Sequence, residues 1–130
     1  MTPTRQVDAS PWPLDRERLG TELRDLQTVA AAIVRAYEVQ QGFQRDLDSY
    51  QLKVVEEIGE LVQAYLQHTK RRQPDGQSPE EIWANVENQA TDVLMFLLIF
   101  CRHAEIDLMT ALERKWFRFG DEVDEGMRAL

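Results

Sequence analysis

Residues 53–61 read KVVEEIGEL, and this stretch decides the fold. Its apolar residues recur at helical spacing, which predicts an amphipathic helix. Glu57 and Glu60 stand three positions apart and therefore share one side of that helix, with Glu56 beside them. Clustered carboxylates raise each other's pKa unless a cation neutralises them. Oxygen ligands without His or Cys suit a hard cation such as Mg²⁺, so the spacing suggests a divalent metal site.

The helix around this stretch is predicted to begin at a cap, Asp46 or Asp48, and to run to about residue 70. Its first apolar stripe comprises Leu47, Tyr50, Val54, Ile58, Leu61 and Tyr65, flanked by Leu52, Val55, Val62 and Leu66. Lys53 falls in the remaining sector together with the three glutamates. Taken alone, that sector is equally typical of an ordinary solvated face, so the metal site needs support from a second helix.

Residues 78–103 supply the second helix. The sequence Ser78-Pro-Glu-Glu81 is a capping box with proline at the first helical position, which is a specific helix-start signal. Four polar residues share one side of this helix: Asn85, Asn88, Gln89 and Asp92. Beyond Asp92 the helix is apolar all round, which predicts burial on every side. Asp92 then adjoins a buried segment, where a carboxylate needs either a cation ligand or an Arg or Lys partner.

Two further helices are expected, over residues 15–39 and from about 106 to 125. The first carries an apolar stripe of Leu19, Leu23, Leu26, Val29, Ala30, Ile33, Val34 and Tyr37. In the last, Lys115 falls inside an apolar stripe and should meet an anion there, unless its stem reaches out to solvent. Arg114 and Arg118 flank it. Four helices with short connections predict an all-α four-helix bundle over residues 15–130, preceded by a loose arm over residues 1–14.

Composition excludes several classes of function. The chain has 130 residues and a net charge of −8, which argues against nucleic-acid polymers and anionic membranes as partners. The single cysteine, Cys101, cannot form an internal disulfide, and it suits a reducing cytoplasm. The longest apolar run, from Val93 to Cys101, is too short to span a bilayer. A cytoplasmic protein is therefore expected.

These motifs resemble the MazG-like, all-α nucleoside triphosphate pyrophosphohydrolases over roughly residues 43–118. The family signature is Glu-Glu-x-x-Glu on one helix and Glu-x-x-Asp on the next. The first half matches residues 56–60, and the second half matches residues 89–92 in part, since Gln89 stands where the family has Glu. The stretch from Ile106 to Trp116 is similar to the family's last helix, whose lysine is expected to contact phosphate and corresponds to Lys115.

Gln89 leaves two interpretations open. It is either a natural, weaker ligand, or an introduced Glu→Gln substitution of the kind that traps a substrate complex. We favour the second, because the exchange keeps the side-chain shape and removes one negative charge. Glu87 points about 200° away on the helix and cannot replace it.

The resemblance implies cleavage of a nucleoside triphosphate to the monophosphate and pyrophosphate. Glu57, Glu60, Gln89 and Asp92 would hold Mg²⁺, or Mn²⁺ in its place, and Glu56 would hold a second ion or act as the base. Lys115, with Lys53 and Arg118, would compensate phosphate charge. Asn85 or Asn88 would bind the base edge, and an aromatic ring would stack on the base; the candidates are Phe43, Tyr50, Trp83 and Trp116.

Assembly and alternatives complete the expectations. A helix that is apolar on all sides needs more cover than one short bundle provides, and the resemblance implies a homodimer or a dimer of dimers. The alternative function is a non-catalytic bundle, acting as a nucleotide-binding or scaffold protein. A di-iron bundle is disfavoured, because neither His68 nor His103 has a Glu three residues before it.

Overall fold

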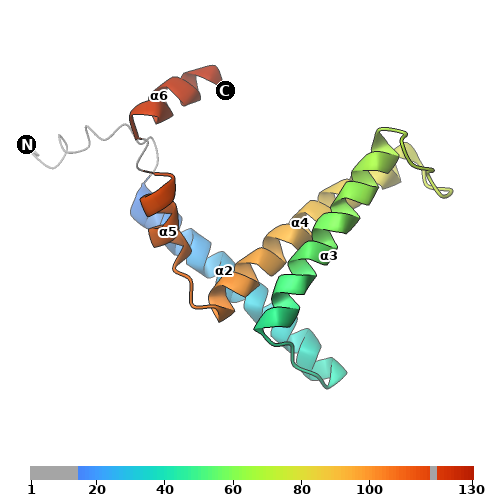
Figure 1. Cartoon of the computed structure of the whole chain (residues 1–130), viewed down its shortest axis with the longest axis horizontal. Coiled ribbons are helices and arrows are strands. Elements are labelled where there is room, and N and C mark those ends of the chain that lie inside the picture. Colours follow the sequence, from blue (N-terminus) through green and yellow to red (C-terminus); the bar gives the residue numbers. More distant parts are fainter. Residues whose placement is uncertain (1–14, 118–119) are drawn as a thin grey trace, which may run out of the picture. The chain divides into compact units, whose positions relative to one another are not determined.

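The computed structural model describes residues 15–117 and 120–130, and the arm expected over residues 1–14 lies outside them. The described chain is helical and contains no strand, which confirms the all-α prediction (Figure 1). The helices are α2 (Arg16–Gln41), α3 (Leu47–His68), α4 (Pro79–His103), α5 (Leu108–Lys115) and α6 (Gly120–Ala129). The single helix predicted from about 106 to 125 is wrong: α5 ends at a turn over residues 116 and 117, and α6 begins at Gly120.

The chain divides into two compact units. One comprises the described residues up to Leu26 together with Ile106–Leu130, and the other is Gln27–Glu105. In the first unit, α2 and α5 approach closely at Gly20, where an added Cβ would lie 3.1 Å from the Met109 side chain. The Arg16 guanidinium donates to the Phe117 carbonyl at 3.1 Å in the same unit. A single helical domain over residues 15–130 stays a prediction.

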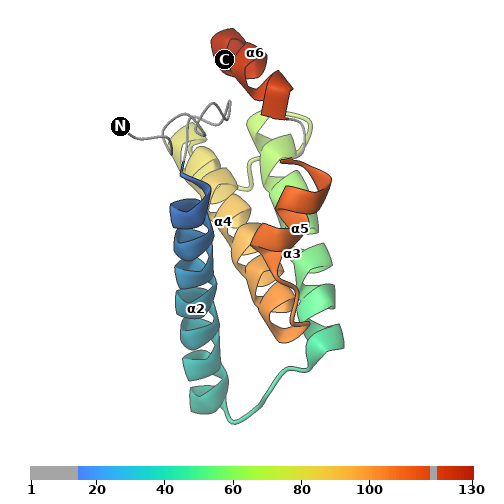
Figure 2. The same cartoon turned by 90° about the vertical axis from the view of Figure 1, so that its left-hand side faces the viewer.

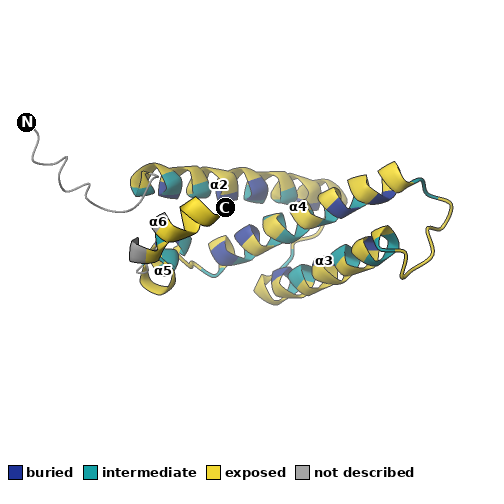
Figure 3. Ribbon diagram, turned by 90° about the horizontal axis from the view of Figure 1, so that it is seen from above, coloured by how far each residue is buried: buried dark blue, intermediate teal, exposed yellow. Residues whose placement is uncertain are grey.

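The second unit is built on an antiparallel pair, α3 and α4, which lie side by side in both views (Figures 1 and 2). The later part of α2 joins this pair through a core of Ala30, Tyr50 and Ile99. Gln27 at the start of that part donates through its amide to the Leu98 carbonyl at 3.2 Å. Buried residues recur along α2, α3 and α4 on narrow lines rather than over whole faces (Figure 3).

Local signals set the helix ends. Asp46 caps α3 by accepting from the Ser49 amide, and the predicted capping box of Ser78 and Glu81 starts α4. At the end of α3, Lys70 adopts φ +64°, and the amides of Lys70 and Arg71 donate to Gln67 and Leu66 carbonyls at 3.1 and 2.9 Å. These two hydrogen bonds together form the Schellman motif, which satisfies the last carbonyls of a helix. The α3–α4 hairpin is therefore fixed at its turn.

Several apolar residues that were expected to be buried are exposed. On α2, Ile33 is 59% exposed, and Val29 and Tyr37 are similarly open. On α4, Leu94 and Leu97 are 47% and 44% exposed, so the prediction of burial on every side is wrong for the single chain. The reason is the narrowness of the buried lines: each helix contacts its neighbours along one side, and the remaining apolar side has no cover within the second unit.

The described helices include none with both the length and the apolar character that a membrane span requires.

A carboxylate cluster between α3 and α4

The antiparallel pairing brings together three of the predicted metal ligands. Glu57 and Glu60 project from α3 toward Gln89 of α4. Both neighbours of the Gln89 amide are acceptors, so its nitrogen faces them: Nε2 donates to Glu60 Oε2 at 3.1 Å and to Glu57 Oε2 at 3.2 Å. Two carboxylate oxygens from successive helical turns therefore converge on one point, as the spacing of the motif predicted.

Glu57 is the buried member of this carboxylate cluster. It is 5% exposed, so the alternative of an ordinary solvated face does not hold for it. Lys53, one turn earlier, places Nζ 3.1 Å from both Glu57 Oε1 and Glu56 Oε1, and 5.4 Å from the centre of the Phe96 ring. Lys53 is thus held by two carboxylates and an aromatic face, and it gives Glu57 a positive partner.

The pKa shifts show how crowded these charges are. A hydrogen bond and charge repulsion from Glu57 raise the pKa of Glu60. Burial, and then the charge of Glu57, raise the pKa of Asp92, while Lys53 acts in the opposite direction. Burial would lower the pKa of Lys53, but its hydrogen bonds to Glu56 and Glu57 outweigh that effect and raise it. One lysine and one amide are therefore too little to neutralise the cluster.

The donor set suits a hard divalent cation. Glu57 and Glu60 direct oxygens to a common point, rotation of the Gln89 amide would add a third oxygen, and Asp92 is close enough to Glu57 to be affected by its charge. Within residues 15–117 and 120–130, no three His, Cys, Asp or Glu side chains gather closely enough to hold a metal. A glutamate at position 89 would supply the missing third carboxylate.

The remaining candidates on α3 and α4 lie around this cluster. Glu56 is exposed and pairs with Lys53. Asn85 is half-buried and lines a polar depression of about 390 Å³ together with Glu60 and Gln89. Asn88 is exposed and does not line that depression. Of the two asparagines, Asn85 is the one placed beside the carboxylates.

Lys115 belongs to the other unit. Lys115 is the last residue of α5 and is exposed, with Nζ 5.8 Å from the centre of the Trp116 ring, which fits the alternative in which its stem reaches out to solvent. Arg118 lies outside the described residues. Their contact with phosphate stays a prediction.

The stacking candidates separate by exposure. Tyr50 is only 2% exposed and belongs to the core, so a base cannot stack on it. Phe43 is edge-on to Tyr37, with ring centres 6.1 Å apart, at the α2–α3 connection. Trp83 is 45% exposed and lies 4.8 Å from the His68 ring at the α3–α4 turn. Trp116 is exposed in the other unit.

A second polar centre was missed by the sequence analysis. Glu38 of α2 is fully buried and accepts a hydrogen bond from the Tyr50 hydroxyl at 2.6 Å. Arg35 and Arg45 donate to its two oxygens at 3.3 and 3.4 Å. The available signal was its position: Glu38 continues the line of Ala30 and Val34 at a spacing of four, the side of α2 that packs.

Comparisons of the chain with protein-family models, with curated proteins and with solved structures give no match.

Proposed function

We propose that this protein is a Mg²⁺-dependent nucleoside triphosphate pyrophosphohydrolase whose activity is reduced by Gln89. The observation that carries the proposal is the convergence of Glu57 and Glu60 with position 89 across the α3–α4 pair, in a cluster whose carboxylates are incompletely neutralised. Mn²⁺ should be able to replace Mg²⁺, because both prefer oxygen ligands. Such a cluster attracts an anionic substrate only when a cation accompanies it.

The proposed reaction is the attack of water on the α-phosphorus of the nucleotide. The new P–O bond forms as the bond to the bridging oxygen of the β-phosphate breaks, and pyrophosphate leaves with that electron pair. Glu56, exposed beside the buried Glu57, accepts the proton of the attacking water, unless it serves as a ligand for a second ion. A bound cation would supply positive charge against the phosphates. Lys53 orients Glu56 and Glu57, and either Asn85 or Asn88 remains the proposed contact to the base.

Pyrophosphate release from a panel of ribo- and deoxynucleoside triphosphates tests this proposal. Three proteins would be assayed with and without Mg²⁺: the unchanged chain, the single variant Gln89→Glu, and the double variant that combines Gln89→Glu with Glu57→Ala. We expect Gln89→Glu to exceed the unchanged chain at least about tenfold, because a carboxylate binds Mg²⁺ more strongly than an amide oxygen. The Glu57→Ala double variant should be inactive while its circular dichroism is retained. No release from any of the three would contradict the proposal.

A second candidate is a nucleotide-binding protein without catalysis. The orientation of Gln89 favours it, since the amide nitrogen donates to both carboxylates where a third carboxylate would otherwise ligate. Nucleotide binding with Mg²⁺, combined with no release from Gln89→Glu, would select this candidate. A scaffold role predicts neither binding nor release.

We also propose that the chain self-associates as a homodimer or a pair of dimers. The exposed apolar residues of the second unit support this: Leu52 and Val55 of α3 are 69% and 64% exposed, and Ile33 of α2 is 59% exposed. A second copy would bury them at about 25 cal/mol per Å² of apolar area. We expect sedimentation of a dimer or larger at micromolar concentration, and a shift toward monomer in Val55→Lys. A stable monomer would contradict this.

A further inference from the structure

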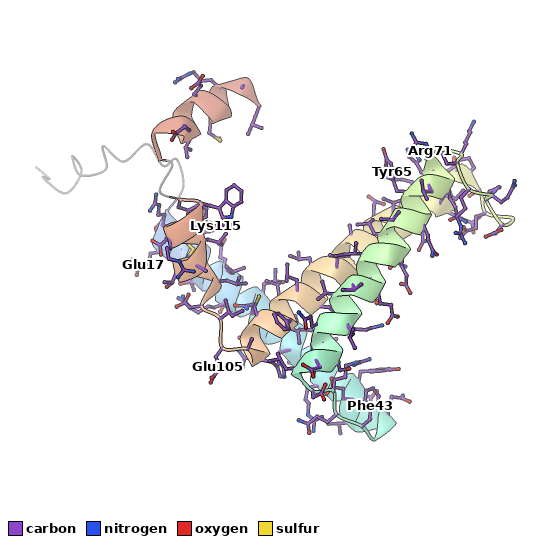
Figure 4. The ribbon with its side chains drawn as sticks, viewed as in Figure 1. Glu17, Phe43, Tyr65, Arg71, Glu105 and Lys115 are labelled. Carbon is purple, nitrogen blue, oxygen red and sulfur yellow. The ribbon has the colours of Figure 1, made fainter. Side chains whose placement is uncertain are left out.

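The turn between α3 and α4 carries three consecutive cations, Lys70, Arg71 and Arg72, at one end of this helix pair. Figure 4 labels Arg71 at this end of the α3–α4 pair and Phe43 at the opposite end. The turn is anchored to α3. The backbone amides of Arg71 and Arg72 both donate to the Leu66 carbonyl, at 2.9 and 3.2 Å, and the side-chain amide Nε2 of Gln67 donates to the Gln73 carbonyl at 2.9 Å. The backbone that bears Arg72 is therefore held in place.

Arg72 lines the same depression as two members of the carboxylate cluster, Glu60 and Gln89. The polar depression of about 390 Å³ is lined by Glu60 and Gln89 of the cluster, by Arg72 and Asp75 of the turn, and by Asn85 of α4. Among the described residues that line it, Arg72 is the only cation. The guanidinium has no hydrogen-bond or ion-pair partner in residues 15–117 and 120–130, since its only bond is made by its backbone amide.

Arg71 occupies a different position, although it is adjacent in sequence. It lines the larger neighbouring depression of about 750 Å³ together with Lys70 and Pro79, but it does not line the polar one. Arg72 lines both depressions. The two arginines therefore carry the same charge on the same turn, and only one of them borders the carboxylates.

We propose that Arg72 binds the terminal phosphates of a polyphosphate substrate whose α-phosphate lies at the Glu57–Glu60–Gln89 point. This rests on the proposed function. The planar guanidinium can donate two parallel hydrogen bonds to phosphate oxygens, which a lysine cannot match. Arg72 then determines that a polyphosphate is bound in preference to a monophosphate, because a monophosphate lacks the terminal phosphates that Arg72 would contact. Lys70 and Arg71 add only attraction at longer range.

Calorimetric titration of the full chain with Mg²⁺ and inorganic tripolyphosphate tests the proposal without depending on turnover. The variants are Arg72→Ala, Arg72→Lys and Arg71→Ala, which is the matched control for loss of charge on the turn. We expect Arg72→Ala to weaken tripolyphosphate binding at least about tenfold, Arg72→Lys to recover part of the loss, and Arg71→Ala to change affinity by less than about threefold. Binding of a nucleoside monophosphate should be the same in all four proteins. Retained circular dichroism establishes that each variant is folded.

The outcomes separate this proposal from the proposed function. If the unchanged chain or Gln89→Glu binds or cleaves nucleoside triphosphates while Arg72→Ala binds tripolyphosphate normally, Arg72 is not a phosphate ligand and the function stands. If Arg71→Ala loses as much affinity as Arg72→Ala, the turn attracts anions only through its total charge, and the assignment to Arg72 is overturned. If neither the unchanged chain nor Gln89→Glu binds tripolyphosphate or nucleotide, both proposals are overturned.

Discussion

Two buried glutamates in the second unit, Glu38 and Glu57, have opposite electrostatic surroundings. Glu38 has two arginines and a tyrosine hydroxyl around one carboxylate, and their hydrogen bonds outweigh the effect of burial and lower its pKa. Burial, and then the hydrogen bond to Glu38, raise the pKa of Tyr50 to about 12. Glu57 has one lysine and one amide, and it shares them with Glu56 and Glu60.

This difference separates a structural carboxylate from a candidate binding site. A buried charge that is fully paired contributes to a unique packing, whereas a cluster of like charges with too few partners costs stability and persists where function requires it. Glu38 joins α2 to the start of α3 through Tyr50, and the Tyr50 ring lies against the His103 ring at an interplanar angle of 46°, with ring centres 4.6 Å apart. The carboxylate cluster, in contrast, opens onto a polar depression.

The largest effect should come from removing the paired carboxylate. We expect Glu38→Ala to lower the free energy of unfolding by about 3–5 kcal/mol, because Arg45, which is mostly buried, and the Tyr50 hydroxyl would lose their common acceptor. Urea unfolding, monitored by circular dichroism, measures the change.

Glu57→Ala is the matched control for this prediction, since it also removes a buried glutamate from a helix of the same unit. In metal-free buffer its cost should be at most about 1 kcal/mol, because the loss of the Lys53 pair is offset by relief of repulsion with Glu60. Equal losses in the two variants would show that the contrast between the two sites has no energetic basis.

A smaller effect should follow from completing the acidic ligand set. Gln89→Glu replaces an amide donor by a third carboxylate, so without metal it should unfold at a lower temperature than the unchanged chain. Mg²⁺ should reverse the order: at 100 times the dissociation constant, bound ligand adds about 2.7 kcal/mol to stability. Thermal unfolding without Mg²⁺ measures the destabilisation by the third carboxylate, and thermal unfolding with Mg²⁺ measures the stabilisation by the bound cation. An unchanged response to Mg²⁺ in Gln89→Glu would exclude position 89 from the metal site.

The sequence was sufficient for the elements with local signals. The capping box at Ser78 was identified, and the cap of α3 was narrowed to Asp46 or Asp48, because each signal depends on residues within one turn. The convergence of Glu57 and Glu60 followed from their spacing on one helix. The place of residue 89 beside them was what the family resemblance implied.

The features that depend on distant contacts were not predictable. Glu57 resembled a solvated residue because it lies outside the broad apolar sector of its helix. Packing against α4 decides which side of that helix is buried, and it buries Glu57. Glu38 finds its partners across the α2–α3 connection, and Arg72 borders the carboxylates through the path of the turn. The break between α5 and α6 has no proline to mark it, so the apolar spacing continued through residues 116–119 in the prediction.

The smallest expected effect is a pH dependence that differs between the two sites. Asp92 and Glu60 have raised pKa values in the folded chain, so their contribution to stability is present below their unfolded pKa and is lost as the pH rises through the folded value. Glu38 has a lowered pKa, so its contribution is present above the unfolded value of 4.5 and is lost only as the pH falls below it.

Metal-free protein should therefore become slightly more stable as the pH is lowered from about 7 to about 5, because the cluster takes up protons while Glu38 stays ionised. Saturating Mg²⁺ should abolish or invert this slope, since protons and the cation compete for the same oxygens. Thermal unfolding at both pH values, with and without Mg²⁺, provides the measurement, and Glu57→Ala should flatten the metal-free slope because the charge of Glu57 contributes to both raised pKa values. A slope that is identical with and without Mg²⁺ would mean that the cation does not bind at these carboxylates, and the contrast with Glu38 would then be one of packing alone.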